Sequence, residues 1–156
     1  VRLTAGTELI KDREPLEMAA MVHDVGLSKG AEGHQRRALD IVMQAELPLE
    51  EVERMMLACI ARYHGLRPPR DDDRVYKGLT RSERKRVVKL SAILALADGL
   101  DRSHGSLVGG IEVSVGRKVI KIKVTGQGDL SSEREWGARK AVQLKRAFGR
   151  EVTVDG

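Results

Sequence analysis

Two adjacent side chains, His23 and Asp24, are the residues of this sequence best placed to do chemistry together. An imidazole and a carboxylate side by side can ligate one divalent metal ion. Residues 16–22 before them are mostly apolar, so we expect the pair at the end of a buried helix that Gly26 terminates. Because burying polar groups without partners is unfavourable, the pair predicts a site rather than a solvated surface.

A second candidate, Asp98, interrupts the apolar run of residues 94–97 in another predicted helix. A lone carboxylate there needs a metal ion, a cation or a proton to tolerate burial. One answer without a metal is an ion pair with Arg102, four residues further on. The other answer is that Asp98 completes the ligand set of His23 and Asp24, and that the two acids carry the catalysis. Both alternatives stay open at this point.

The size and the cysteine content fit a protein of the reducing cytoplasm. A chain of 156 residues builds one domain, or one domain with a small appendage. Its single cysteine, Cys59, falls in an apolar helical pattern and is expected in the core. The sequence contains no apolar stretch long enough to span a bilayer and no signal-peptide pattern. We therefore expect a cytoplasmic protein without a membrane partner.

The charge of the chain favours an anionic partner. Its 28 Lys and Arg against 23 Asp and Glu leave a net charge of +5, and most of the cations are arginines. The planar guanidinium suits phosphate oxygens, although a charged surface also serves solubility alone. With only two Tyr, one Trp and one Phe, the chain offers no stacking platform for bases. The expected partner is a phosphate-rich small molecule or polyphosphate, and nucleic acid is disfavoured.

Helical patterns fill the first two thirds of the chain. We expect the remainder of a helix over residues 1–11, and then helices over 16–24 opened by Pro15, from His34, from Pro48 to about 62–64, and over 81–102 behind a capping box of Thr80 and Glu83. Residues 65–78 have a loop composition, and the acidic triplet at 71–73 is interpreted as a solvated turn.

The pattern changes to strands near residues 109–110. Residues 111–115 and 118–124 alternate around a Gly116-Arg117 turn, which predicts a β-hairpin. A helix over 131–148 and a strand over 151–154 complete a β-β-α-β tail. The predicted fold is mainly α, a helical bundle over residues 1–108, followed by a small α+β subdomain over 109–156.

Further polar residues stand near predicted helix ends. His34 and Arg36 lie where a helix begins, a position whose exposed N–H groups favour anions, although ordinary surface residues would look the same. Arg62 and His64 close another helix and, taken alone, indicate only C-terminal helix charges.

Four segments carry a resemblance to a known family: residues 23–26, 33–34, 61–64 and 94–102. In this order and spacing they resemble the HD-type domain at the C-terminal end of exopolyphosphatase/guanosine pentaphosphate phosphatase proteins, and the tail resembles that family too. The resemblance implies an HD-domain helical bundle and an HD-type phosphohydrolase, in which a metal ion activates water for attack on polyphosphate or nucleotide phosphates.

The resemblance also implies particular roles. His23, Asp24 and Asp98 would bind the metal, and Arg62 and His64 would point toward the same pocket. The expected phosphate-binding residues are His34, Arg36, Arg62, His64 and Arg102. HD phosphohydrolases use a further His from the first helix, which residues 1–22 lack, so we expect this helix to be truncated. One nitrogen and two oxygens suit Mn²⁺ or Mg²⁺ with several waters.

An alternative function follows from the parent family, where polyphosphate cleavage is attributed to an N-terminal actin-like pair of domains. Under this alternative the chain is a non-catalytic accessory module that binds polyphosphate or mediates dimerisation, and its HD pocket is vestigial. An actin-like region of the same protein and a second copy of the chain are then the expected protein partners.

Overall fold

The computed structural model describes the backbone of residues 7–156 and the side chains from residue 12 onward. The elements in chain order are α1 (Thr7–Val22), a 3₁₀ helix η1 (Val25–Lys29), α2 (His34–Gln44), α3 (Glu51–Arg62), α4 (Arg74–Gly78), α5 (Arg81–Leu100), β1 (Val108–Val115), β2 (Val119–Gly126), α6 (Ser131–Phe148) and β3 (Glu151–Asp155). The predicted fold class, mainly α with a small β-containing tail, is confirmed. Within the described part of the chain, no helix combines the length and apolar character needed to cross a lipid bilayer.

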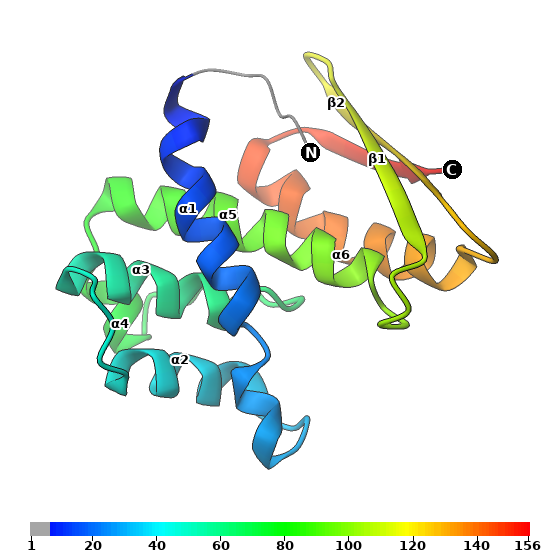
Figure 1. The fold of residues 1–156 in the computed structure, drawn as a ribbon. Coiled ribbons are helices and arrows are strands. Elements are labelled where there is room, and N and C mark those ends of the chain that lie inside the picture. Colours follow the sequence, from blue (N-terminus) through cyan, green and yellow to red (C-terminus); the bar gives the residue numbers. More distant parts are fainter. Residues whose placement is uncertain (1–6) are drawn as a thin grey trace.

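Helix α5 is buried on two sides and belongs to two hydrophobic cores. Val87, Leu90 and Leu94 pack with α1, α2 and α3 in the first core. Leu96 and Leu100, further along the helix, pack with α6 and the sheet in the second core. Figure 1 shows α5 running past α1 and α3 toward α6. Side chains near residue 98 therefore lie where the two cores meet.

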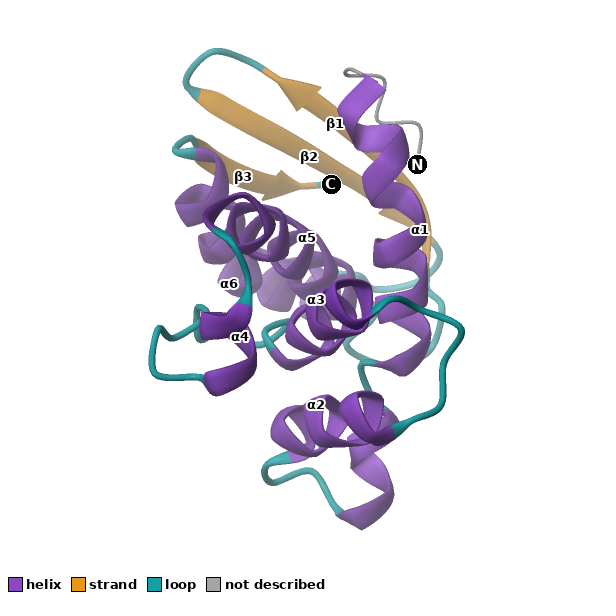
Figure 2. Ribbon diagram, turned by 90° about the vertical axis from the view of Figure 1, so that its left-hand side faces the viewer, coloured by secondary structure: helices purple, strands orange, loops and turns teal. Residues whose placement is uncertain are grey.

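The three-stranded sheet has the order β1-β2-β3, with β1 and β2 antiparallel and β2 and β3 parallel. The predicted hairpin and third strand are thus confirmed. Alternation along β2 buries Ile120, Ile122 and Val124 and exposes Lys121 and Lys123, because successive side chains of a strand point to opposite faces. Figure 2 shows the sheet over α5 and α6, with α2 at the opposite end of the molecule.

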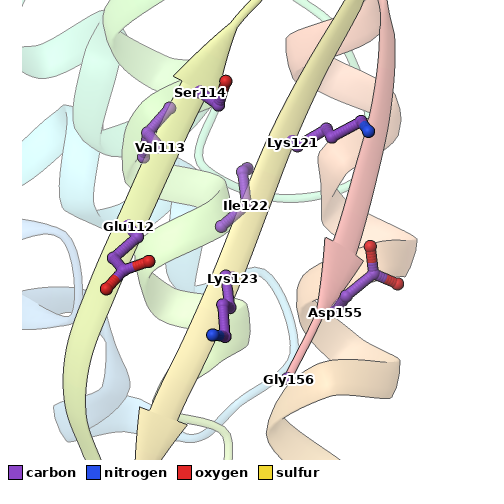
Figure 3. A pocket seen from close by; sticks show the side chains of 8 residues that line it. All are labelled: Glu112, Val113, Ser114, Lys121, Ile122, Lys123, Asp155 and Gly156. Carbon is purple, nitrogen blue, oxygen red and sulfur yellow. The ribbon is translucent and has the colours of Figure 1, made fainter.

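The outer face of the sheet is polar and carries a hollow of about 550 Å³. Figure 3 shows Glu112, Lys121, Lys123 and Asp155 on this face, with the helices behind the strands. Glu112 lies opposite Lys123 on the neighbouring strand, and Lys123 lies opposite Asp155 on the other side. Because acids and bases alternate across the strands, this face presents mixed charge rather than a cluster of convergent ligands.

Two predicted helix starts are wrong. Pro15 does not open a helix but lies inside α1, where its ring removes one backbone hydrogen bond. Leu16, Met18 and Val22 of α1 pack against the first core, and this packing stabilises the helix across the proline. The helix after Pro48 begins at Glu51, where the Glu50–Glu53 capping box satisfies the free N–H groups. Residues 1–6 of the first predicted helix lie outside the described residues.

The packing of α5 against α6 depends on glycine. A Cβ added at Gly99 would lie 2.9 Å from the carbonyl oxygen of Trp136 and 3.2 Å from the Cα of Gly137. Both are backbone atoms, which cannot yield as a side chain can. The absence of a side chain at Gly99 therefore allows the two helices to approach closely at the residue next to Asp98.

We expect Gly99→Ala to lower the free energy of unfolding by about 2 kcal/mol. Overpacking against backbone costs up to about 3 kcal/mol, and the gain in helix propensity offsets only about 1 kcal/mol of this. Urea denaturation measures the difference. Gly109→Ala is the control, since a Cβ there meets no atom closer than 3.8 Å. Equal effects of the two substitutions would show that helix packing at Gly99 is not tight.

Candidate functional site

The turn after α1 brings its end next to the start of α2. His23 and Asp24 follow Val22 directly, and η1 then packs against α2. Gly26 makes this packing possible, because a Cβ there would lie 2.9 Å from the backbone nitrogen of Ala38. The same turn is held by Arg37, whose Nε donates to the carbonyl of Gly26 at 2.9 Å. The His-Asp pair is therefore fixed by backbone contacts rather than left on a free helix end.

The structure brings the three predicted metal ligands together. Nε2 of His23 lies 3.3 Å from Oδ2 of Asp24 and 3.9 Å from Oδ1 of Asp98. The side chains of His23 and Asp98 are less than a fifth exposed, and that of Asp24 is one third exposed. Asp24 is thus the most exposed of the three predicted ligands.

Two more histidines join this group. The ring of His64, which follows α3, makes an edge contact with the ring of His23, with 4.9 Å between centroids. The ring of His34, the first residue of α2, lies 5.7 Å from that of His64. Ligand atoms of His23, His64 and Asp98 lie within 4.8 Å of one another, as do those of Asp24, His34 and His64. We call these five residues the histidine–aspartate cluster.

The backbone selects one tautomer for all three histidines. Nδ1 of His23 lies 2.8 Å from the carbonyl oxygen of Ala20, and Nδ1 of His34 lies 2.7 Å from that of Ala31. Nδ1 of His64 lies 2.5 Å from the carbonyl oxygen of Ala61. A carbonyl only accepts, so each Nδ1 carries the proton and each neutral ring keeps its lone pair on Nε2. This second hydrogen bond orients a histidine for metal binding.

Burial keeps His64 neutral. The residue is 2% exposed, and loss of water around its ring lowers its pKa to about 4. The nearby Lys140 and His23 act in the same direction, while the hydrogen bond to Ala61 and the charge of Asp24 oppose it. At neutral pH the imidazole is therefore uncharged, which is the form that binds metal ions.

Asp98 has a partner that sequence reasoning missed. Its Oδ2 forms an ion pair with Nζ of Lys140 on α6, a residue of the tail. Burial lowers the pKa of this lysine, and the charge of Asp24 raises it. Lys140 falls on the same face of α6 as the buried Gly137, Ala141 and Leu144, which is the sequence signal that was available. Spacing alone does not show which helix that face contacts.

Gln143 of the same helix supports the other side of the cluster. Its buried side chain donates from Nε2 to the carbonyl oxygen of Gly65 at 3.0 Å, one residue after His64. Lys140 and Gln143 are three residues apart and so lie on one face of α6. Helix α6 therefore contacts both Asp98 and the segment that carries His64.

The structure places Arg62 in a different contact. Its guanidinium pairs with Oδ2 of Asp73 at 2.7 Å, and the hydroxyl of Tyr63 donates to the same oxygen at 2.7 Å. Oδ1 of Asp73 accepts from the N–H groups of Val75 and Tyr76 and so caps α4. Asp73 is 9% exposed, so the interpretation of the acidic triplet as a solvated turn is wrong for this residue. Its neighbours Asp71 and Asp72 are exposed, as predicted.

The two other predicted phosphate-binding arginines are exposed. Arg36 lies in the first turn of α2. The guanidinium of Arg102 lies over the ring of Trp136, 4.4 Å from its centroid, and is thus not the partner of Asp98. A second guanidinium, that of Arg139, lies 5.0 Å from the same ring centroid. Trp136 lies four residues before Lys140, one helical turn along α6, and Arg102 follows the end of α5.

Comparison with protein families identifies the class of the chain. Residues 4–144 match the family described as Ppx/GppA phosphatase, domain III. Because this match spans most of the 156 residues, the chain belongs to that family, and the predicted relationship to exopolyphosphatase/guanosine pentaphosphate phosphatase proteins is confirmed. No curated protein matches the sequence significantly.

We expect Asp73→Ala to lower the free energy of unfolding by about 3 kcal/mol, because it leaves the Arg62 guanidinium and the Tyr63 hydroxyl without their partner. Asp72→Ala removes the same charge from an exposed pair with Arg70 and should change stability by less than about 1 kcal/mol. Chemical denaturation of both variants measures this. A small loss for Asp73→Ala would contradict a structural role of this network.

The buried His64 predicts a pH dependence of stability. Its pKa is 6.5 in the unfolded chain and about 4 in the folded protein, so only the unfolded state takes up this proton between those values. The contribution is fully present above pH 6.5 and is lost as the pH falls toward 4. In EDTA, the wild-type protein should lose about 3 kcal/mol more over this range than His64→Gln.

Denaturation midpoints at a series of pH values measure this difference. His104→Asn is the control, because His104 is an exposed loop residue with a left-handed backbone that asparagine tolerates. Its pH profile should follow that of the wild type. If His64→Gln also follows it, His64 is not held neutral by burial.

Proposed function

We propose that this domain is a divalent-metal-dependent phosphohydrolase of the HD type, acting on polyphosphate or nucleotide phosphates. One observation carries the proposal: three histidines, each with Nδ1 against a backbone carbonyl, gather around two carboxylates. Nε2 of His23 lies within 4 Å of both Asp24 and Asp98, and ligand atoms of His34 and His64 lie within 4.8 Å of those of the acids. Histidines that serve only the core do not need their free nitrogens to converge on acids. Membership in the Ppx/GppA phosphatase family supports phosphate chemistry for the same chain.

The donor set fits a divalent ion. The cluster offers two groups of three ligands, His23 with His64 and Asp98, and Asp24 with His34 and His64. Mixed imidazole nitrogens and carboxylate oxygens are ligands of the kind that Mn²⁺ accepts, whereas Mg²⁺ prefers oxygen and water. Asp98 can bind an ion through Oδ1, which faces His23, while Oδ2 keeps its contact with Lys140. His34 and His64 supply nitrogens that the set of His23, Asp24 and Asp98 lacked. We therefore propose Mn²⁺ before Mg²⁺.

A bound divalent ion supplies a coordinated water of lowered pKa and polarises a phosphoryl oxygen. The chain's own residues would do the rest. Asp24, the most exposed of the proposed ligands, would accept a proton from a water molecule. The free N–H groups at the start of α2, beside His34, stand where the helix dipole favours an anion and would face a phosphate of the substrate, while His34 itself would ligate the metal. Arg36 and Arg102 would contact outer phosphates of the substrate, and Arg62 is left to its pair with Asp73.

The buried thiol of Cys59 supports a cytoplasmic location as part of this proposal, since a free cysteine fits a reducing compartment. The alternative of a non-catalytic accessory module has no observation in its favour here.

We expect the protein to bind Mn²⁺ and to release phosphate from polyphosphate or a nucleoside triphosphate. Asp24→Asn should lower both the Mn²⁺ affinity and the rate at least about 100-fold, because it removes a charged ligand. Asp40→Asn, which makes the same charge change on an exposed residue of α2, should leave both unchanged. Calorimetric titration with Mn²⁺ and a phosphate-release assay measure the two quantities.

Phosphate release that is equal in the wild type and Asp24→Asn would remove the proposed function. Binding of polyphosphate without hydrolysis, at any Mn²⁺ concentration, would favour the accessory module instead.

A further inference from the structure

A lysine of the tail occupies a position beside the metal ligands that neither the sequence nor the family match assigned. Nζ of Lys140 on α6 contacts Oδ2 of Asp98 on α5, and only 11% of the lysine side chain is exposed. An ammonium group on a shielded carboxylate acts as a counter-ion that is already present. It is held there by the packing of the two helices at Gly99, because neither helix can move apart without exposing the second core.

The charges in the histidine–aspartate cluster indicate how this counter-ion would affect the binding of a cation. Asp24 and Asp98 are its carboxylates, and the three imidazoles hold their lone pairs on Nε2. Lys140 compensates one of the two negative charges, so that one remains to attract a cation. A divalent ion bound to Oδ1 of Asp98 would lie close to the ammonium on Oδ2, and the two positive charges would repel each other.

We propose that Lys140 is an internal competitor for Asp98 that sets the affinity of the cluster for divalent cations. This inference rests on the proposed function, because it concerns the same ligands. It also gives the tail a part in the site: α6 belongs to the second core, yet it supplies the cation on Asp98 and, through Gln143, the contact to Gly65 beside His64. A separate helical bundle would lack this control.

The first measurement is calorimetric titration of the metal-free protein with Mn²⁺. Lys140→Met keeps the length of the side chain and removes its charge, so the dissociation constant should fall by about tenfold or more. Lys145→Met is the matched control: it removes the same charge from α6, where Lys145 pairs with Glu151 on the surface. This variant should bind Mn²⁺ as the wild type does.

The second measurement needs no metal. In EDTA, Lys140→Met should lower the melting temperature, because Asp98 loses its partner, and saturating Mn²⁺ should restore it. In an Asp98→Asn background the same substitution should have a much smaller effect in EDTA, since the pair is already broken. Circular dichroism establishes that each variant is folded before these comparisons.

The outcomes separate the two proposals. Equal or weaker Mn²⁺ binding by Lys140→Met, with the wild type binding measurably, overturns the competitor role and leaves the proposed function standing. A raised substrate KM without a change in Mn²⁺ affinity also overturns it, and identifies Lys140 as a phosphate contact. Failure of every variant to bind Mn²⁺ overturns the proposed function and this inference together. Tighter binding by Lys140→Met alone supports both.

Discussion

The close contact between α5 and α6 is the constraint on which the rest of the structure depends. Gly99 lets the two backbones approach, and the residue before it, Asp98, then meets a lysine of the opposite helix. Because α5 is buried by the helical core on one side and by the tail on another, only 17% of the Asp98 side chain is exposed. A charge in that position must be neutralised by something inside the protein. The contacts of Asp98 with His23 and Lys140 are the consequence of where this one acid is held.

The backbone does as much for the site as the side chains do. Each of the three histidines returns Nδ1 to a carbonyl three residues earlier, so that a short local contact decides which nitrogen is free. Burial of His64 removes the charged form of its ring from the neutral pH range. Side chains held in this way are pre-organised, because neither the tautomer nor the ring orientation would have to change if an ion bound. This pre-organisation is the physical reason for proposing a metal centre rather than a set of core histidines.

Local patterns predicted the elements well where nothing distant competed with them. Alternation along residues 118–124 predicted strand β2, and the capping box of Thr80 and Glu83 predicted the start of α5. Both predictions succeeded because strand pleat and helix capping are short-range properties. The same kind of reasoning failed at Pro15, where packing of α1 on the first core outweighs one missing hydrogen bond. It failed again at Asp73, which resembles its exposed neighbours in sequence but is buried by Arg62 and Tyr63.

The sequence by itself determined the types of chemical group, the helix ends that carry them and the family to which the chain belongs. It indicated His23, Asp24 and Asp98 as one group because an acid inside an apolar run needs a partner. Only the tertiary structure decided which partner that is. Lys140 stands 42 positions after Asp98 in the chain, and Arg102 only four, yet the lysine makes the contact. The packing of α5 on α6 determines the partner of Asp98. Helical spacing fixes which residues share a face of a helix, but not which residues that face contacts.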